Sequence, residues 1–139
     1  MIIRKILLKD YNNYIKLIDS NITFEKFSNF INNILNDKHI ILVIEDENEL
    51  IGTGTLLIED KITYGGCKLG HIENIFIHEN CRGLKLGIKL VDELIKIAKK
   101  ECCYRIELNC DESLIKFYEK NNFIKYQTIM SLYIKENFM

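Results

Sequence analysis

Glycines and basic residues gather where a strand-like segment gives way to a helical one. Residues 72–77 are rich in β-branched and aromatic side chains, and residues 82–87 read Arg-Gly-Leu-Lys-Leu-Gly before a long amphipathic run. Glycine at such a junction lets backbone N–H groups approach an anion, and a helix N-terminus adds a partial charge of about +0.5. Arg82 and Lys85 add full charges. The pattern predicts a site for the pyrophosphate of a nucleotide-type cofactor, although a simple helix start with solvated charges gives the same pattern.

Size and charge exclude several classes of protein. A chain of 139 residues with 47% hydrophobic and 28% charged residues indicates one globular domain over residues 1–139. A net charge of -1 argues against a nucleic-acid partner. No apolar run reaches the ~18–20 residues that cross a bilayer, and the first residues do not read as a signal peptide. We therefore expect a cytoplasmic protein with no membrane partner.

The cysteines and histidines do not have the spacing of metal ligands. There are five cysteines, an odd number, and no pair is spaced Cys-x-x-Cys. They are Cys67, Cys81, Cys102, Cys103 and Cys110. The three histidines are scattered. We expect reduced, mostly buried thiols and no metal site.

Hydrophobic periodicity and turn residues predict an alternating order of strands and helices. The expected elements are a strand over 2–8, a short helix from Asp10, a helix capped by Thr23, strands over 39–45 and 50–59 around a turn, a turn at 64–66, a strand over 69–77, a long helix, a strand over 104–109, a helix over 112–120 and a final strand over 123–134. Gly52 and Gly54 predict a bulge or a close neighbour within their strand. This order indicates an α/β (α+β) fold whose sheet is mostly antiparallel, with one parallel pair across the long helix.

Several segments together resemble the Gcn5-related N-acetyltransferase (GNAT) superfamily, and within it the branch that acetylates glucosamine 6-phosphate. The segments that carry the resemblance are 70–75 (Gly-His-Ile-Glu-Asn-Ile), 82–87, 103–106 (Cys-Tyr-Arg-Ile), 109–112 and 116–123. They run in order over about half of the chain. The resemblance implies the GNAT fold, in which helices flank a mixed sheet and a splayed central strand binds acetyl-CoA.

The resemblance also implies which residues hold the co-substrate acetyl-CoA. The implied set is Ile75, Phe76, Ile77, Arg82, Gly83, Leu84, Lys85, Leu86, Gly87, Ile88, Asn109 and Tyr118. The strand residues would hold the pantetheine and the thioester carbonyl, and the backbone amides of 82–88 would hold the pyrophosphate. Lys85 replaces the middle glycine of the family pattern, which bears on coenzyme affinity.

Three residues would be catalytic by the same resemblance. Tyr118 would stabilise or protonate the departing thiolate, and Glu73 would contact the amine or act as a base. Asn109 would orient the amine through its backbone carbonyl. From the residues alone, a core tyrosine of an amphipathic helix is the better interpretation of Tyr118, and Glu73 fits a half-exposed strand carboxylate equally well. Asn74 and Asn109 stand where the family often has aspartate, which weakens general-base help, and Leu114 replaces an asparagine that normally contacts the coenzyme.

A phosphorylated amino sugar needs cations to hold its phosphate. The resemblance implies a substrate site made of Lys61, Glu73, Asn74, Tyr104, Arg105 and Lys135, in which the three cations converge. Each cation taken singly also fits a solvated surface charge. The last strand often crosses to a second subunit in this branch, so we expect a homodimer in which Lys135 serves the partner's site.

The resemblance thus implies acetyl transfer from acetyl-CoA to glucosamine 6-phosphate, by direct amine attack, in UDP-N-acetylglucosamine biosynthesis. Two alternatives stay open. One is acetylation of a different amine, namely a peptide N-terminus, a lysine or a polyamine. The other is an acetyl-CoA-binding module that has lost activity, for which Lys85, Asn109 and Leu114 are the supporting departures.

Overall fold

A five-stranded sheet in the order β1-β2-β3-β4-β5 forms the centre of the computed structural model, which describes residues 1–83 and 85–135. The strands are β1 (Ile2–Lys5), β2 (His39–Asp46), β3 (Glu49–Asp60), β4 (Lys68–Ile77) and β5 (Cys103–Leu108). The first three neighbouring pairs are antiparallel, and β4 pairs with β5 in parallel. The predicted mixed, mostly antiparallel sheet with one parallel pair is confirmed.

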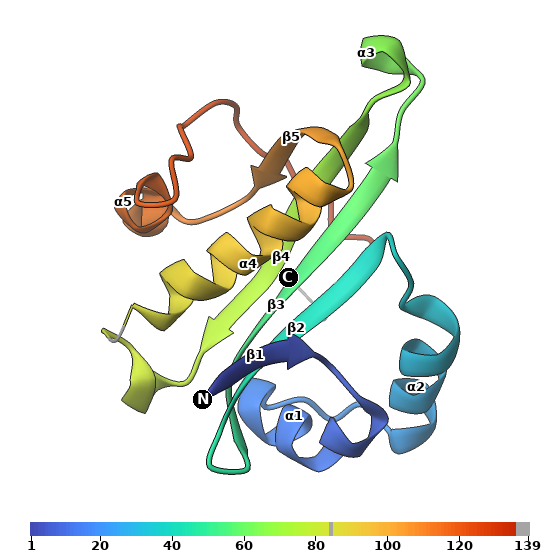
Figure 1. Cartoon of the computed structure of the whole chain (residues 1–139), viewed down its shortest axis with the longest axis vertical. Coiled ribbons are helices and arrows are strands. Elements are labelled where there is room, and N and C mark those ends of the chain that lie inside the picture. Colours follow the sequence, from blue (N-terminus) through green and yellow to red (C-terminus); the bar gives the residue numbers. More distant parts are fainter. Residues whose placement is uncertain (84, 136–139) are drawn as a thin grey trace.

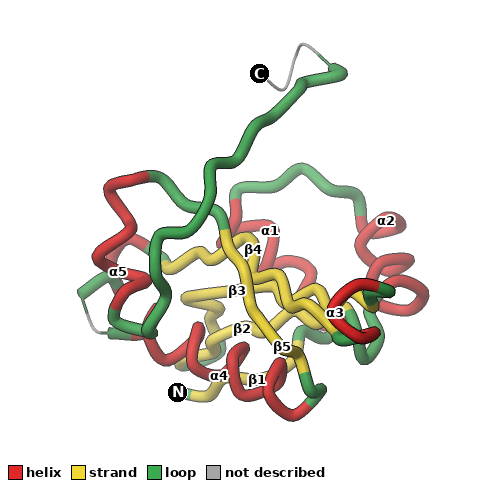
Figure 2. The backbone as a smooth tube through the Cα atoms, turned by 90° about the horizontal axis from the view of Figure 1, so that it is seen from above, coloured by secondary structure: helices red, strands yellow, loops and turns green. Residues whose placement is uncertain are grey.

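Helices cover both faces of this sheet (Figure 1). The α-helices are α1 (Tyr11–Ile18), α2 (Phe24–Asn29), α4 (Leu86–Lys100) and α5 (Ile115–Glu119). Short 3-10 turns occupy Leu8–Asp10, Glu79–Cys81 and Glu112–Leu114, and a π-helical turn, η2, continues α2 over Phe30–Ile34. Figure 2 shows α1 and α2 on one side of the sheet and α4 on the other.

Each helical layer buries its own hydrophobic cluster. Leu90, Val91, Leu94 and Ala98 of α4 are completely buried against one face of the sheet, as the periodicity predicts. On the other face, Leu17 and Phe27 pack with Ile41 and Val43 of β2. The sheet therefore separates two cores, and a residue's place in a strand decides which layer its side chain meets.

Local signals account for several element boundaries. Oγ1 of Thr23 accepts a hydrogen bond from the backbone N–H of Lys26 (3.2 Å), as expected of an N-cap residue. Glu47 and Asn48 both have positive φ between β2 and β3, as a two-residue hairpin turn requires. The segment α3 (Thr63–Gly66) is a tight turn rather than a helix, because Tyr64 and Gly65 have left-handed dihedrals.

The predicted final strand over 123–134 is wrong for the single chain. Residues 123–133 have no regular secondary structure, and most of their apolar side chains are exposed. Figure 2 shows this C-terminal segment leaving the sheet and rising away from the rest of the molecule. A strand needs a neighbour for its backbone hydrogen bonds, and alternation of apolar residues alone does not supply one.

Candidate functional site

A bulge in the middle of β4 interrupts its pairing with β3. Thr53 pairs with Phe76 and Thr55 with Glu73, so Gly54 alone lies opposite Asn74 and Ile75. Asn74 takes φ of 54°, a left-handed conformation that asparagine tolerates better than most residues. A Cβ at Gly54 would lie 2.6 Å from Cδ1 of Ile75, so the glycine makes room for the bulged strand. The close neighbour predicted from Gly52 and Gly54 is confirmed at both, since a Cβ on Gly52 would lie 2.8 Å from Cδ1 of Ile77, whereas the bulge opposite Gly54 belongs to β4 rather than to the glycines' own strand.

Beyond the bulge, β4 and β5 separate. The last pair of the parallel ladder joins Ile72 to Leu108, where β5 ends, whereas β4 continues to Ile77. The backbone of β4 from Glu73 onward thus lacks β5 as a partner, and its N–H and C=O groups on that edge are available to a ligand. The expected splay of the central strand is confirmed.

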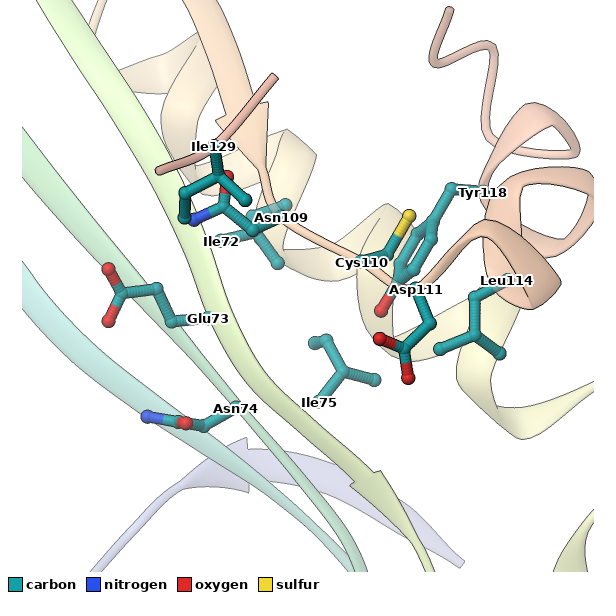
Figure 3. Close-up of a pocket in the computed structure, with 10 residues that line it drawn as sticks. All are labelled: Ile72, Glu73, Asn74, Ile75, Asn109, Cys110, Asp111, Leu114, Tyr118 and Ile129. Atoms are coloured by element: carbon teal, nitrogen blue, oxygen red, sulfur yellow. The ribbon is translucent and has the colours of Figure 1, made fainter. Parts of the chain in front are cut away.

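The opening between the two strands holds a cavity of about 390 Å³, called here the thioester cavity. Its walls include Glu73, Asn74 and Ile75 of β4, Asn109 and Cys110 after β5, and Tyr118 of α5 (Figure 3). All three predicted catalytic residues therefore line one cavity. Glu73 and Tyr118 are 45 positions apart in the sequence, and the parallel crossover from β4 to β5 brings them to the same cavity.

Tyr118 is held rigidly at this cavity. Its side chain is only 8% exposed, and its ring packs edge-to-face with Phe117 (centroids 4.8 Å apart) and Phe123 (6.2 Å). Its hydroxyl end points toward the cavity in Figure 3. Burial raises the pKa of Tyr118, and the nearby Cys110 thiol raises it further. At neutral pH the hydroxyl is therefore protonated and can donate.

Glu73 and Asn74 reach toward the opposite side of β4. Figure 3 shows the carboxylate and the amide extending away from Tyr118 and Cys110. Both residues also line a second cavity of about 310 Å³, called here the helical cavity, which lies between the sheet and the α1–α2 layer. The two cavities thus meet at the bulge. None of the described residues that line either cavity is Lys or Arg.

The predicted anion loop lies at the start of α4. Nε of Arg82 donates to the carbonyl of Ile77 (3.2 Å), which ties the loop to the end of β4. Gly83 has φ of 87°, and Lys85, the N-cap of α4, has φ of 60°. Lys85 thus occupies a left-handed position that glycine adopts without strain. Leu84 lies outside the described residues.

Three further predicted cofactor residues, Leu86, Gly87 and Ile88, form the first turn of α4. Gly87 has a packing role there: an added Cβ would lie 2.6 Å from Cζ of Phe117. Phe76 and Ile77 complete the free edge of β4, with Phe76 partly exposed.

The predicted phosphate cations are spread along the chain. Arg105 lies over the rings of Tyr104, Tyr126 and Tyr64, 5.3 to 5.8 Å from their centroids, and its Nη2 pairs with Glu107 at 2.6 Å. Lys61 pairs weakly with Glu59 (3.7 Å).

Within one chain, Arg105 does not adjoin the bulge. Arg105 pairs with Leu69, four residues before Glu73, or about 13 Å along a strand at roughly 3.3 Å per residue. Lys135 lies in the exposed C-terminal segment. Convergence of the three cations stays a prediction.

Some features were not predicted. Asn121 is 7% exposed, and its Nδ2 donates to the carbonyl of Ile88 (3.1 Å) and to Oδ1 of Asp92 (2.8 Å), which joins the end of α5 to α4. A single asparagine after a helix gives no sequence signal of such a role. All five cysteines are free, but the prediction that most are buried is wrong, because Cys102 and Cys110 are exposed and the others partly so.

The described part of the chain has neither a cluster of metal ligands nor a helix that could span a membrane. No cluster of three or more His, Cys, Asp or Glu side chains is arranged to hold a metal ion among the described residues. Within the same residues, every helix is too short or too polar to span a membrane.

Comparison with known proteins gives consistent matches. The model of the acetyltransferase (GNAT) family matches residues 3–123. Glucosamine 6-phosphate N-acetyltransferase 1 of Dictyostelium discoideum is 35% identical over 123 residues, covering 86% of this chain and 78% of the relative. Probable glucosamine 6-phosphate N-acetyltransferase 2 of Oryza sativa is 38% identical over 103 residues, covering 71% of this chain and 62% of the relative.

Solved structures match over almost the whole chain. The crystal structure of glucosamine-6-phosphate N-acetyltransferase from Arabidopsis thaliana has a TM-score of 0.92 and 32% identity, covering 96% of this chain and 98% of that chain. An acetyltransferase of Trypanosoma brucei has a TM-score of 0.89 at 24% identity, which bears on the fold alone.

Proposed function

The chain belongs to the acetyltransferase (GNAT) family, and from this we propose that it transfers the acetyl group of acetyl-CoA to the amine of glucosamine 6-phosphate. The observation that carries the proposal is the thioester cavity at the splay of β4 and β5, with Tyr118 on one side and the bulge on the other. The names of the relatives supply the substrate. The product would enter UDP-N-acetylglucosamine biosynthesis. The chain would act in the cytoplasm as a single domain.

Acetyl-CoA would lie along the free edge of β4. Its pantetheine would pair with the backbone of Ile75, Phe76 and Ile77, which lack β5 as a neighbour. Its pyrophosphate would meet the backbone amides of 82–88 at the start of α4, where the helix dipole favours an anion. Arg82 and Lys85 would add charge-assisted contacts to the phosphates.

Direct attack by the amine on the thioester fits the residues at the cavity. The amine nitrogen would form a bond to the carbonyl carbon while the C–S bond breaks. Tyr118 would donate its proton to the leaving thiolate, since burial keeps the hydroxyl protonated. Glu73, on the other side of β4, would attract the ammonium and accept a proton. The backbone carbonyl of Asn109 would orient the amine nitrogen.

The sugar phosphate would be held by a second copy of the chain. Neither cavity is lined by Lys or Arg among its described residues, so the counter-charge must come from elsewhere. The C-terminal segment exposes Ile124, Met130, Leu132 and Ile134, at least 81% each, which is typical of a surface that a partner covers. We infer a homodimer in which this segment brings Lys135 to the partner's site.

A thiol-release assay tests the proposed activity. Acetyl-CoA is held at one concentration, and glucosamine 6-phosphate, glucosamine and a lysine-rich peptide are compared as acceptors. We expect turnover with the phosphorylated sugar, at least tenfold faster than with glucosamine at equal low concentration. Turnover with the peptide alone would refute the sugar assignment, and coenzyme binding without turnover of any amine would indicate a module that has lost activity.

A further inference from the structure

Tyr118 lies on a helix whose position depends on its neighbours. The helix α5 has only five residues, and a helix of that length gains little stability from its own hydrogen bonds. One contact that holds it is apolar, the packing of Phe117 on Gly87 of α4. Because apolar contact has no direction, it does not by itself fix the rotation of α5, which decides where the Tyr118 hydroxyl points.

Asn121, two residues after α5, supplies a directional contact. Its side-chain Nδ2 donates to the backbone carbonyl of Ile88 (3.1 Å) and to Oδ1 of Asp92 (2.8 Å), one turn further along α4. Its backbone N–H donates to the carbonyl of Tyr118 (2.9 Å). Among the described residues, no other side-chain hydrogen bond joins residues 115–123 to α4. One residue therefore connects the backbone of the proposed proton donor with the first two turns of α4.

The orientation of this amide follows from its partners. A backbone carbonyl and a carboxylate only accept hydrogen bonds, so the NH2 end of Asn121 must face Ile88 and Asp92. Oδ1 then lies buried at the other end, without a hydrogen-bond partner among the described residues. A buried carbonyl of this kind costs stability, which a leucine of similar size would avoid. Such a cost is typical of a group kept for position rather than for stability.

The part of α4 that Asn121 contacts also belongs to the proposed coenzyme site. Residues 86–88 are the first three of α4, and their backbone amides would face the pyrophosphate. The coenzyme docked on α4 and β4 would fix the sulfur, whereas α5 fixes the Tyr118 hydroxyl. A proton donor must come within about 2.6–3.2 Å of the atom it protonates, and a misplacement of about 1 Å costs roughly 10²-fold in rate. A contact that ties α5 to α4 therefore governs this distance.

We propose that Asn121 is a positioning residue, whose bridge to Ile88 and Asp92 holds the Tyr118 hydroxyl at the thioester sulfur. It lines neither the thioester cavity nor the helical cavity, so it acts through Tyr118 and not on the substrates. This inference rests on the proposed use of acetyl-CoA and on Tyr118 as the proton donor.

A double-mutant cycle with Tyr118→Phe tests this role. Asn121→Leu keeps the approximate size of the side chain but removes both hydrogen bonds. It should lower kcat at least tenfold, measured as thiol release with the amine that the parent acetylates. KM for acetyl-CoA should change less than threefold, because β4 and the predicted anion loop remain intact. In a Tyr118→Phe chain the same substitution should lower kcat less than twofold, since no proton donor is left to misplace.

Asn13→Leu is the matched control. Nδ2 of Asn13 donates to the backbone carbonyl of Asn48 (3.2 Å), so this substitution also removes an amide hydrogen bond between distant segments. Asn13 belongs to α1, which lies across the sheet from α4 (Figure 2). We expect kcat of the Asn13→Leu protein to change less than twofold.

A hydrogen bond restored in the opposite direction should restore part of the rate. Asn121→Asp places a carboxylate opposite that of Asp92 and should lower kcat at least tenfold. Asp92→Asn in the same chain gives the pair a donor again, so kcat should recover at least threefold, although the carbonyl of Ile88 stays without its side-chain partner. No recovery would overturn the inference.

Each other outcome has a defined meaning. Equal losses of kcat in the parent and in the Tyr118→Phe chain would overturn the inference. So would a lower midpoint of urea denaturation with unchanged kcat, which would show a role in stability alone. A tenfold rise in KM for acetyl-CoA at unchanged kcat would also overturn it, because the bridge would then serve the coenzyme loop. If Asn121→Leu does not fold, Asp92→Ala removes one acceptor at an exposed position and should cause at least a threefold loss that depends on Tyr118.

This inference and the proposed function fail separately. A parent that acetylates glucosamine 6-phosphate but shows no loss that depends on Tyr118 overturns only this inference. A parent that acetylates a different amine refutes the sugar assignment, and the cycle is then measured with that amine. A parent that acetylates no amine overturns both.

Discussion

Gly87 in the first turn of α4 faces the ring of Phe117 so closely that a Cβ on the glycine would lie 2.6 Å from Cζ. Phe117 precedes Tyr118 and packs against it edge-to-face. The glycine expected to serve the coenzyme loop is therefore also the surface on which α5 is seated. One side chain, that of Phe117, thus connects the predicted coenzyme loop to Tyr118, the predicted proton donor.

Gly87→Ala should loosen α5. Overpacking of this kind costs about 1–3 kcal/mol of stability, and the shift of Tyr118 should lower kcat. Urea denaturation and steady-state kinetics measure the two effects. Phe117→Leu in the same chain should recover most of the lost stability, and a Gly87→Ala protein as stable as the parent would contradict the contact.

Lys85→Gly should separate strain from charge. Relief of the left-handed conformation should raise stability by up to about 1 kcal/mol, whereas loss of the ammonium should weaken acetyl-CoA binding and reduce its dependence on salt. Calorimetry at two ionic strengths and urea denaturation test both effects. Lys85→Ala is the control, since it removes the charge but keeps a side chain at positive φ. Tighter binding by Lys85→Gly would mean that the lysine Cβ crowds the phosphate.

Tyr118→Phe should lower kcat by about 10²-fold or more while KM for the sugar changes little. The raised pKa means that the donor hydroxyl is retained up to its ordinary value of about 10 and beyond, so the parent enzyme should show no alkaline loss from Tyr118 below that pH. Tyr11→Phe is the control, because the Tyr11 hydroxyl donates to Ile22 and lines neither cavity. An unchanged kcat would remove Tyr118 from the chemistry.

Acid should unfold the protein in part through Asp10. Burial of Asp10 favours the neutral acid, but two hydrogen bonds from Arg4 (2.8 Å each) and one from the Leu7 N–H (2.7 Å) outweigh it and lower the pKa. A carboxyl with a lowered folded-state pKa stabilises the fold above its unfolded value near 4, and this stabilisation is lost as pH falls through the folded value.

Asp10→Asn should therefore cost about 1.5–3 kcal/mol at pH 7, and the difference from the parent should shrink as pH falls below about 4. Thermal unfolding across pH 2–7 measures this. Asp19→Asn, at the exposed end of α1, is the matched control and should have little effect at either pH. A constant difference across the range would mean that the Asp10 charge does not contribute.

Mixed dimers would test the exchange of Lys135. Tyr118→Phe and Lys135→Ala chains should each have low kcat/KM for the sugar when prepared alone. After they are unfolded and refolded together, half of the dimers would carry one intact site, so activity should rise toward a quarter of the parent value. Activity no higher than the mean of the two variants measured alone would show that Lys135 does not act in the partner's site.

The sequence by itself determined the elements whose signals are local. The hairpin between β2 and β3, the Thr23 cap, the buried stripe of α4 and the parallel crossover all follow from turn residues, capping and period within a few neighbouring positions. The family segments also named most residues of the thioester cavity, because they lie in two runs joined by that crossover.

Only the tertiary structure decided what depends on contacts between distant segments. Strand register places Glu73 where it lines two cavities, and packing of α1 and α2 on the sheet forms the wall of the helical cavity, so neither feature could be read from spacing. The same alternation of apolar residues that predicts a strand over 123–134 leaves it unpaired in one chain, because a strand exists only where another backbone satisfies its hydrogen bonds. Sequence specifies local propensity, and the neighbours that complete a cavity or a sheet are chosen by the fold.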